Sequence, residues 1–531
     1  MQTVSKSWKD VHKQTLLNES FVEVSLDIGD PEAIARASAT DNGSVYISNT
    51  PDVVSEVDKE VIPYGTLEQN MWILDGSRKH IPAANYMSGE YIGDELSKED
   101  GGFTTKTPTI IIDFPWTQST LIPGITITWG TAYNEFARHF VVTAYRGATI
   151  VTTKEIVDNK SVTSIVELDI ANYDRITVQV MRWCLPNRRV RVDEIFLGWH
   201  KVYAKTELMS YSHAQTVDPI STSLPKMEVK FSIDNSDNSY NPYNINGLSK
   251  YLTERQEVKV RYGLKLNDNT VEWIKGGTFY LSEWYAKQNG LTADFVARDL
   301  LEFMSANYKD EVTEISDRSL YELAIQVLQA ANLPLNKDGS ERWVVDTSLD
   351  SIYTTAPLPD DTIANCLQLI ANAGCCVIYP DRDGILHIEP INTKVTDYTI
   401  NSFNSYSKPE ITLSKAIKEV VVKVYTYTIG EDGVESTTQD VVVSIGDTGE
   451  TITIDNPLIT DDGYAGNIGE WVGNYLKNRM TLKSSVRADV RLDALDIVTN
   501  EHDYGTDQVR ITSVDFKFNG AFKGTSEGRV I

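Results

Sequence analysis

The chain has 531 residues, 41% of them hydrophobic and 23% charged, a composition typical of a globular protein of three or four domains. Its net charge of −26 argues against binding to the phosphate backbone of nucleic acids and against attraction to anionic membranes. The sequence has no apolar run long enough to span a bilayer, no apolar segment typical of a secretory signal near its start, and only four cysteines. We therefore expect synthesis in a reducing cytosol.

Most of the chain alternates apolar and polar residues, which is the pattern of β-strands that bury one face. Such runs occur at residues 22–28, 125–129, 166–170, 176–180, 227–233 and 420–424. Strands with one apolar face are typical of antiparallel sheets packed as sandwiches or barrels. The sequence therefore predicts a fold that is mainly β.

Three segments show helical spacing of their apolar residues instead, at 317–332, 361–373 and 466–480. Ser319 and Glu322 form a capping box at the start of the first segment. Gly374 follows the second segment as a C-terminal stop. These helices are few and scattered among strands, so we expect a mainly β fold with an α+β part.

Shifts in pattern and composition divide the chain into regions. Residues 1–60 contain a few strands but no complete core, whereas residues 61–200 form a dense all-β block with 13 Lys and Arg against 16 Asp and Glu. A nearly neutral, tryptophan-rich block inside a strongly acidic chain indicates an inserted domain. Strands resume in 201–305, two helices and a hairpin fill 306–410, and strands surround the third helix in 411–531.

Two hairpins far apart in the chain are alike. Each consists of an aromatic-rich strand, an Asn-Gly turn and a second strand, and the turns lie at Asn289-Gly290 and Asn519-Gly520. Chance similarity between hairpins and duplication of one domain both account for the likeness. Duplication would give the chain two domains of the same fold.

The sequence contains no catalytic signature. It has no Gly-rich phosphate loop followed by Lys, no H-E-x-x-H and no G-x-S-x-G, and its seven histidines are scattered. The adjacent Cys375 and Cys376 have no further cysteines at metal-binding spacing, so we expect them to be buried thiols. We therefore expect no enzymatic activity and no catalytic cofactor.

One structural calcium ion is compatible with the inserted block. Asp75 lies near the start of the block, and Glu194 lies near its end. The first and last strands of a jelly-roll sandwich come close together, so these two carboxylates and nearby backbone carbonyls would suit calcium. The other interpretation is a pair of solvated carboxylates at strand ends.

Aromatic rings of the same block are candidates for stacking on the apolar face of a sugar. Those in loop-like stretches are Tyr86, Tyr91, Trp116 and Tyr133. Trp129 lies in an alternating strand and is expected in the core. The alternative for every ring of the block is a place in the core, because a sandwich of this size needs large buried side chains.

Several motifs resemble, in the correct order, the tail hub proteins of tailed phages and prophages, a family known as baseplate hub or tail-associated proteins. They are FSIDNSDNSYNPYNINGLSKYLTERQEVKVRYGL, WIKGGTFYLSEW, ADFVARDLLEF, CVIYPDRDGILHIEP, EWVGNYLKNRM, VRADVRLDALDIV and VRITSVDFKFNGAFKGTSEGRVI. This resemblance covers residues 1–60 and 201–531. The block 61–200 resembles galactose-binding-like jelly rolls through its Trp-rich strands and its closing RVRVDEIFLGW.

The resemblance implies a domain plan and a structural role. Residues 1–60 and 201–305 would form a first hub β-barrel, interrupted by the carbohydrate-binding-like β-sandwich of 61–200. Residues 306–410 would form a small α+β hub domain, and 411–531 a second hub β-barrel. Members of the family form homotrimers, in which six barrels make a ring that closes the tail tube and connects it to host-adhesion parts.

The same resemblance implies partners and a location. The expected partners are the distal tail ring protein, the tape-measure protein and a tail fibre or receptor-binding protein, with host cell-wall saccharide as a candidate ligand of the inserted block. We expect the protein in the virion, at the tail tip or baseplate, after synthesis in the host cytoplasm. We expect neither membrane binding nor specific nucleic-acid binding.

Two other classes of protein are alternatives. One is a carbohydrate-active enzyme, which would need two carboxylates facing one cleft. The other is a cell-surface carbohydrate-binding adhesin, which would need an export signal and an anchor. No sequence feature selects either class.

Overall fold

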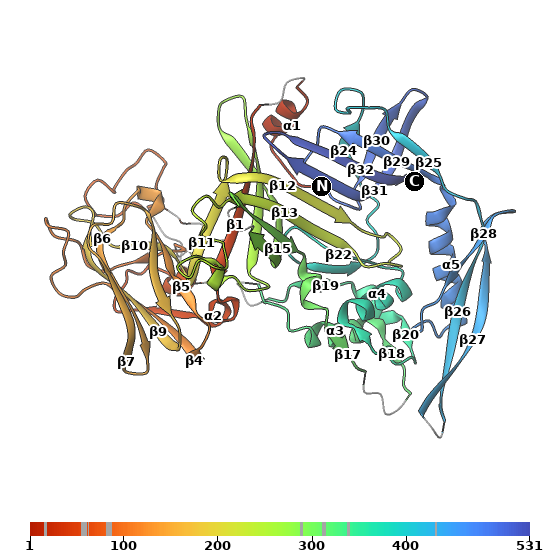
Figure 1. The fold of residues 1–531 in the computed structure, drawn as a ribbon, viewed down its shortest axis with the longest axis horizontal. Coiled ribbons are helices and arrows are strands. Elements are labelled where there is room, and N and C mark those ends of the chain that lie inside the picture. The colour runs from red at the N-terminus through yellow and green to blue at the C-terminus, as the bar shows by residue number, and fades with distance from the viewer. Residues whose placement is uncertain are drawn as a thin grey trace.

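The computed structural model describes residues 1–14, 18–54, 61, 63–80, 88–286, 290–310, 315–336, 340–430 and 433–531 (Figure 1). The fold is mainly β, as the alternating pattern predicted. Figure 1 shows a sandwich at one end, a broad sheet in the centre, and helices with a long hairpin at the other end. In the described part of the chain, no helix combines the length and the apolar character that crossing a membrane requires.

One sheet of 13 strands runs through the centre of the molecule and joins two groups of strands. The first group, here called the first barrel unit, contains in sheet order β11 (Gly198–Ala204), β1 (Ser20–Gly29), β14 (Glu257–Lys265), β15 (Val271–Ala286), β16 (Thr292–Arg298), β13 (Lys226–Asp234) and β12 (Leu208–Thr216). The second barrel unit continues the sheet with β31 (Gly505–Phe518), β32 (Phe522–Val530), β29 (Met480–Val486) and β25 (Glu410–Leu413), while β30 (Ile497–His502) and β24 (Val395–Ile400) branch from β31.

The apolar faces of both barrel units pack into one hydrophobic core. Alternation along β13 places Val229, Phe231 and Ile233 in this core, as the sequence predicted. Phe231 stacks on Phe295 of β16, with 5.1 Å between the ring centroids. Each large side chain buried in this way contributes about 1.5–3 kcal/mol to folding. Helix α1 (Lys6–His12) adds Trp8 to the same core.

The two barrel units repeat one layout. The register between β15 and β16 shifts after Leu281, and the register between β31 and β32 shifts after Ile511. Beside these bulges, Arg255 and Leu495 both adopt a positive φ, at 68° and 74°. Each donates its backbone N–H to the carbonyl of the bulged strand, Arg255 to Leu281 and Leu495 to Ile511, both at 2.7 Å. A shared bulge and a shared unusual φ favour duplication over chance, although Asn289 of the first Asn-Gly turn lies outside the described residues.

The inserted domain is a sandwich of two antiparallel sheets. One sheet contains β2 (Ser38–Asp41), β4 (Thr109–Gln118), β9 (Tyr173–Trp183), β6 (Ala137–Arg146) and β7 (Thr149–Ile156), and the other contains β3 (Tyr91–Ile92), β10 (Arg191–Phe196), β5 (Ile122–Trp129) and β8 (Thr163–Ile170). Trp129, Trp183 and Phe140 lie in the core between the sheets. The rings of Trp129 and Phe140 meet edge to face, 5.0 Å apart.

The sandwich begins before residue 61, which is the start that the sequence predicted. Strand β2 pairs with β4, and α2 (Pro31–Arg36) and η1 (Thr50–Val53) contribute Ala33 and Val53 to the sandwich core. The boundary at 61 was therefore wrong. A four-residue strand carries too little pattern to show which sheet it joins, and only its pairing with β4 assigns it.

A second large core lies under helices α3 (Leu320–Ala330) and α4 (Ile363–Ala373), with β19 (Trp343–Val345), β23 (Leu386–Glu389) and β22 (Val377–Pro380) beside them. The predicted capping box is present, because Ser319 accepts from the backbone N–H of Glu322 and Glu322 accepts from that of Ser319. Gly374 is the C-cap of α4, as expected.

Part of the region 411–531 packs with these helices and not with the second barrel unit. Strands β26 (Ile417–Gly430), β27 (Gly433–Ser444) and β28 (Glu450–Ile454) form a separate sheet covered by α5 (Asp462–Lys477), and Val422 and Ile468 join the core of α3 and α4. Conversely, β24 from the region 306–410 pairs in the main sheet. Assigning all of 411–531 to one barrel was wrong, because alternation identifies a strand but not its sheet.

Short elements complete the chain. They are η2 (Thr131–Tyr133), η3 (Ser249–Tyr251), η4 (Leu300–Phe303), η5 (Thr347–Ser351), β17 (Asn307–Tyr308), β18 (Arg318–Ser319), β20 (Tyr353–Thr354) and β21 (Asp361–Thr362).

Candidate assembly joint and sandwich site

Strands β12 and β31 join the two barrel units edge to edge. Their antiparallel register runs from Tyr211 opposite Phe518 to Thr216 opposite Ser513. In Figure 1 the strands of the two units lie side by side along this joint. Because the backbone hydrogen bonds of one sheet cross the joint, the two units form one structural block.

A histidine is buried under the joint. Nδ1 of His213 lies 2.9 Å from the hydroxyl of Tyr262, which also lies 2.7 Å from the hydroxyl of Tyr211. Burial together with the nearby charge of Arg382 lowers the pKa of His213 to about 3, with the carboxylate of Asp493 opposing the shift. The imidazole is therefore neutral near pH 7 and serves the packing of the joint.

Arg382, in the turn between β22 and β23, links three parts of the molecule. Its Nε donates to the carboxylate of Asp493 at 2.6 Å, and its two terminal nitrogens donate to the carbonyls of Lys275 at 2.8 Å and Leu492 at 3.0 Å. The guanidinium lies 5.8 Å from the ring centroid of Tyr262. Because Arg382 is buried, these bonds replace the water that the group has lost.

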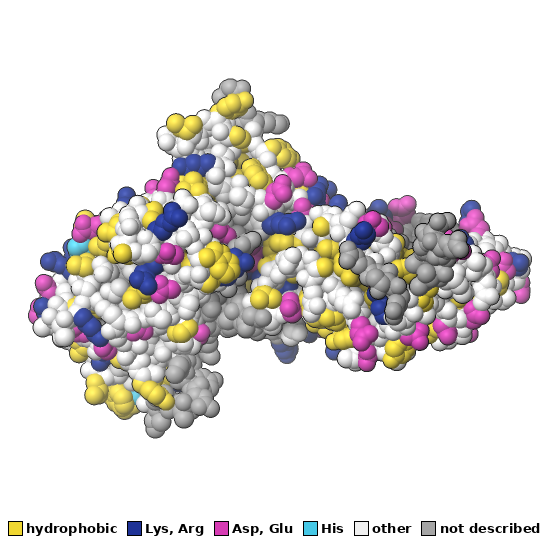
Figure 2. Space-filling view, turned by 90° about the horizontal axis from the view of Figure 1, so that it is seen from below, with side chains coloured by type: hydrophobic (Ala, Val, Ile, Leu, Met, Phe, Trp, Pro, Cys, Tyr) yellow, Lys and Arg dark blue, Asp and Glu magenta, His cyan; other side chains and the backbone are white. Residues whose placement is uncertain are grey.

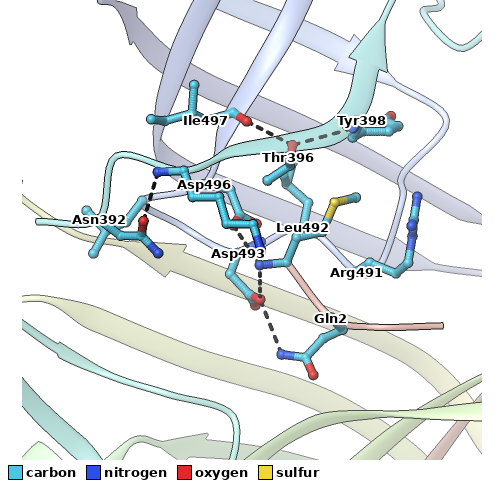
Figure 3. A network of polar contacts seen from close by, with 12 residues as sticks. Gln2, Asn392, Thr396, Tyr398, Arg491, Leu492, Asp493, Asp496 and Ile497 are labelled. Carbon is cyan, nitrogen blue, oxygen red and sulfur yellow. Dashed lines mark hydrogen bonds and ion pairs between the residues drawn. The ribbon is translucent and has the colours of Figure 1, made fainter.

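Figure 3 shows the loop of the second barrel unit that receives Arg382. The side chain of Gln2 donates to Asp493 at 3.4 Å, and the backbone N–H of Asp493 donates to Asp496 at 2.8 Å. The hydroxyl of Thr396, on β24, donates to the carbonyl of Ile497 at 2.8 Å. These bonds fix the N-terminal segment and β24 to the same loop.

A buried ion pair lies at one end of the sandwich. Arg191 of β10 donates to both carboxylate oxygens of Glu68, at 2.5 and 3.0 Å, and both side chains are buried. Burial disfavours the charge of Glu68, but the hydrogen bonds and the charge of Arg191 outweigh it and hold the pKa of Glu68 below its usual range. The pair fastens the loop that carries Glu68 to the sheet.

Two further carboxyl groups lie at this end: that of Glu90, 4.0 Å from Nε of Arg191, and that of Asp193, which interacts with Glu90. Burial raises the pKa of Glu90 to about 8, with Arg191 opposing the rise and Asp193 adding to it. The carboxylate of Asp193 accepts hydrogen bonds from the backbone N–H of Thr131, at 2.9 Å, and from its hydroxyl. Glu90 therefore carries its proton at neutral pH. Because both carboxyl groups are buried, they act in the packing of the sandwich.

Tyr91 is fully buried, so its ring is closed off from a ligand at the surface. It lies in the sandwich core, and its hydroxyl donates to the carbonyl of Gly43 at 3.1 Å. Its selection as a sugar-contacting residue was wrong, because Tyr91 belongs to the two-residue strand β3 and not to a loop. Tyr86, a second candidate, lies outside the described residues.

The other two aromatic candidates lie at opposite ends of the sandwich. Trp116 is near the start of β9, because the neighbouring Gln118 pairs with Tyr173. Tyr133 follows Trp129, whose ring lies 6.1 Å from that of Trp183 at the end of β9. The structure therefore does not bring Trp116 and Tyr133 into one site.

The end with Tyr133 carries a cluster of aromatic and cationic groups. Tyr133 is half-buried between the guanidinium groups of Arg78 and Arg191, each 4.7 Å from its ring centroid. On the loop that carries Arg78, Trp72 is 52% exposed, with its ring edge-on to His80 at 4.7 Å. Trp72 was not among the residues predicted to contact a sugar, although its non-alternating surroundings in the sequence mark it as a loop residue. Trp116 is equally exposed, but Arg36 covers one face of its ring at 4.4 Å.

The carboxylate of Asp75 is engaged by its own turn. It accepts hydrogen bonds from the backbone N–H of Ser77 at 2.9 Å and from its hydroxyl at 2.5 Å, and these bonds lower its pKa. Glu194 lies on β10. Within the described ranges, no group of three or more His, Cys, Asp or Glu side chains could hold a metal ion. The calcium ion stays a prediction, and a calcium-dependent rise in the unfolding temperature of the sandwich would support it.

No family model matches the sequence, and no curated protein is significantly similar to it. Among solved structures, the chain is similar to the 43 kDa tail protein of prophage MuSo2 from Shewanella oneidensis, with 13% identity, 62% of this chain and 95% of that chain covered, and a TM-score of 0.42. It is also similar to the prophage tail protein gp18 from Listeria monocytogenes, with 12% identity, 62% and 91% covered, and a TM-score of 0.39.

A further similar structure is the lectin domain of lectinolysin, solved in complex with Lewis B antigen. That likeness has 12% identity, covers 31% of this chain and 93% of that chain, and has a TM-score of 0.19. The solved structures similar to this chain thus include tail proteins of prophages, the class of protein that the sequence motifs resemble.

Proposed function

We propose that this chain is a structural protein of a phage or phage-like tail tip, a baseplate hub whose barrel units form a ring at the end of the tail tube. The duplicated layout is the observation that supports this most, since both units contain the same bulged hairpin and one sheet joins them. A chain made of two copies of one unit can place them in equivalent positions of a ring. Three chains would supply six units and connect a sixfold tube to a threefold tip.

The packing of the barrel units supports a structural role. Their interiors are filled by large side chains, among them Phe231, Tyr262, Phe279 and Phe516. His213, whose pKa is lowered to about 3, is neutral and closed off from solvent. Such interiors suit a rigid building block and not a container for a ligand.

The charge of the chain suits a passage for DNA. A net charge of −26 repels a polyanion, so DNA would move along an assembly of such chains without sticking to it. Figure 2 shows acidic side chains over the visible face, many of them at the end that carries the β26–β28 sheet.

The proposed surroundings follow from the role of a hub. The chain would contact the distal tail ring protein and the tape-measure protein on the tube side, and a fibre or receptor-binding protein on the host side. It would be made in the host cytoplasm and act in the virion.

We propose that the sandwich is an outward module that contacts host saccharide or a neighbouring tail protein. Figure 1 shows it at one end of the molecule, and Asp169 anchors it to the first barrel unit by contacts with Lys250 and Tyr251. The exposed ring of Trp72 beside Tyr133 and Arg78 favours saccharide. Three copies acting together would multiply a weak affinity.

Purified particles test the structural role. Antibody labelling should find the chain at the tail tip, and deletion of its gene should leave particles without functional tails. Intact, infectious particles that lack the chain would contradict the proposal.

Binding of the full chain to host cell-wall preparations tests the saccharide module. Trp72→Ala should weaken binding by about fivefold, which corresponds to about 1 kcal/mol for one aromatic contact. Trp116→Ala is the matched control, because Trp116 is equally exposed at the opposite end of the sandwich. Absence of binding would leave the architectural contact as the function of the module, and equal loss in both variants would contradict the assignment of the sugar contact to Trp72.

A further inference from the structure

The duplicated layout matches four consecutive strands of one barrel unit to four consecutive strands of the other. The bulged hairpins match β15 to β31 and β16 to β32. Next in the sheet come β13 and β29, and then β12 and β25. The strand register agrees with this match. In the first unit His213 of β12 lies opposite Val229 of β13, and in the second unit Ile411 of β25 lies opposite Leu482 of β29.

Each of the two strands that form the β12–β31 joint has an equivalent strand, here called its counterpart, in the other barrel unit. Within the chain, β12 pairs with residues 513–518 of β31. The counterpart of β12 is β25, and the counterpart of the first part of 513–518 is residues 283–286 of β15. In the described part of the chain, β25 pairs only with β29, and β14 pairs with β15 only as far as Tyr280. Both counterparts therefore have a free strand edge.

The backbone of β25 is oriented for pairing on its free side. The N–H of Ser414 donates to the carbonyl of Arg479, on the side of β29. Backbone groups of successive residues in an antiparallel strand point to alternate sides. Ile411 and Leu413 therefore direct their N–H and C=O groups away from β29, toward the free edge.

The side chains of the same two residues are apolar and exposed. Ile411 is 57% and Leu413 is 63% exposed, on an edge strand. Their counterparts in β12 are His213 and Gln215, which the joint with β31 helps to bury. An exposed apolar edge strand is a ready template for pairing with another chain. The match to β12 indicates that this other chain is a second copy of the same protein. Within one copy, β31 already covers the equivalent edge of β12.

We infer that β25 of one copy pairs antiparallel with residues 283–286 of β15 in the next copy, and so repeats the β12–β31 joint between chains. The in-chain register gives the expected pairs Leu413–Trp284, Thr412–Tyr285 and Ile411–Ala286. The two edges are different parts of the chain, so the contact is head to tail and generates a closed ring when the rotation closes. The inference rests on the proposed function for the ring and names the surface that builds it.

Disulfide trapping between two single variants tests the register. Ile411 and Leu413 bond across the joint, so Thr412 and Tyr285 form the intervening pair without backbone bonds, whose Cα atoms lie about 4.5 Å apart. That spacing permits a disulfide. Thr412→Cys mixed with Tyr285→Cys should give a covalent dimer, whereas each variant alone should not. The in-chain counterpart, Ala214→Cys with Asp515→Cys, is the positive control.

The outcomes of the trapping experiment separate the inference from the proposed function. A dimer from Thr412→Cys alone, or none from the mixture while the control forms its bond, would overturn the inference. If the chain is nevertheless found in tail particles, the proposed function stands without it. A mixed dimer from a chain that particles lack would support the joint and contradict the tail role.

Charge substitution at the edge tests the energetics. The double variant Ile411→Lys/Leu413→Lys should weaken self-association at least tenfold in sedimentation measurements, because lysine on an edge strand opposes pairing. The matched control is Ile150→Lys/Val157→Lys on the sandwich, where the side chains are 57% and 65% exposed. Equal association of both variants with the unchanged chain would overturn the inference, and their unfolding midpoints show that both are folded.

Discussion

Replacing Arg382 by methionine should loosen the centre of the molecule. The substitution removes a buried guanidinium that bonds to Asp493, to the carbonyl of Lys275 and to that of Leu492. Breaking a buried pair costs about 3–5 kcal/mol, because the remaining charge and carbonyls lose their partner. We expect a value near 3 kcal/mol, since Asp493 is 19% exposed and keeps the hydrogen bond from Gln2.

Urea unfolding followed by hydrogen exchange and mass spectrometry measures this loss region by region. Arg382→Met should lower the protection of β12, β31 and β22 together, because Arg382 links the three parts that contain them. Arg175→Met is the matched control, since Arg175 also bonds through Nε to an aspartate, Asp113, at 2.6 Å but on the surface. It should cost less than about 1 kcal/mol. Equal effects of the two variants would refute the reasoning.

Two predictions concern pH. The pKa of Glu90 rises from 4.5 to about 8 on folding, so the stability of the sandwich should fall as pH rises through that range. In urea midpoints followed by tryptophan fluorescence, Glu90→Gln should flatten this pH dependence. An unchanged dependence in the variant would contradict the prediction. The pKa of His213 falls from 6.5 to about 3, so the unfolded chain takes up a proton first and stability should fall as pH decreases from 6.5 to 3. His213→Gln should reduce that loss in the protection of β12, and equal loss in both proteins would argue against a neutral buried imidazole.

Local features of the fold could be predicted from the sequence. Alternation identified the strands and placed Val229 and Phe231 in the core, since one buried face imposes a period of two. The capping box of Ser319 and Glu322 was found because both partners are only three residues apart. The Asn-Gly turns indicated the repeat that the bulges after Leu281 and Ile511 now support.

Features that depend on distant pairing could not be predicted. Nothing local to Ser38–Asp41 shows that β2 joins β4 of the sandwich. Tyr91 looked like a loop residue because its strand has two residues. The cluster around Arg191 unites Glu68, Glu90 and Tyr133, which come from separate segments and meet only in the folded sandwich.

An electron cryomicroscopy map of the assembled tail tip would show directly how the barrel units are arranged and joined. We expect three copies in a ring of six barrel units, in which β12–β31 joints within chains alternate with β25–β15 joints between chains. A map in which β25 faces solvent, or in which single copies decorate the outside of the tube, would contradict this expectation.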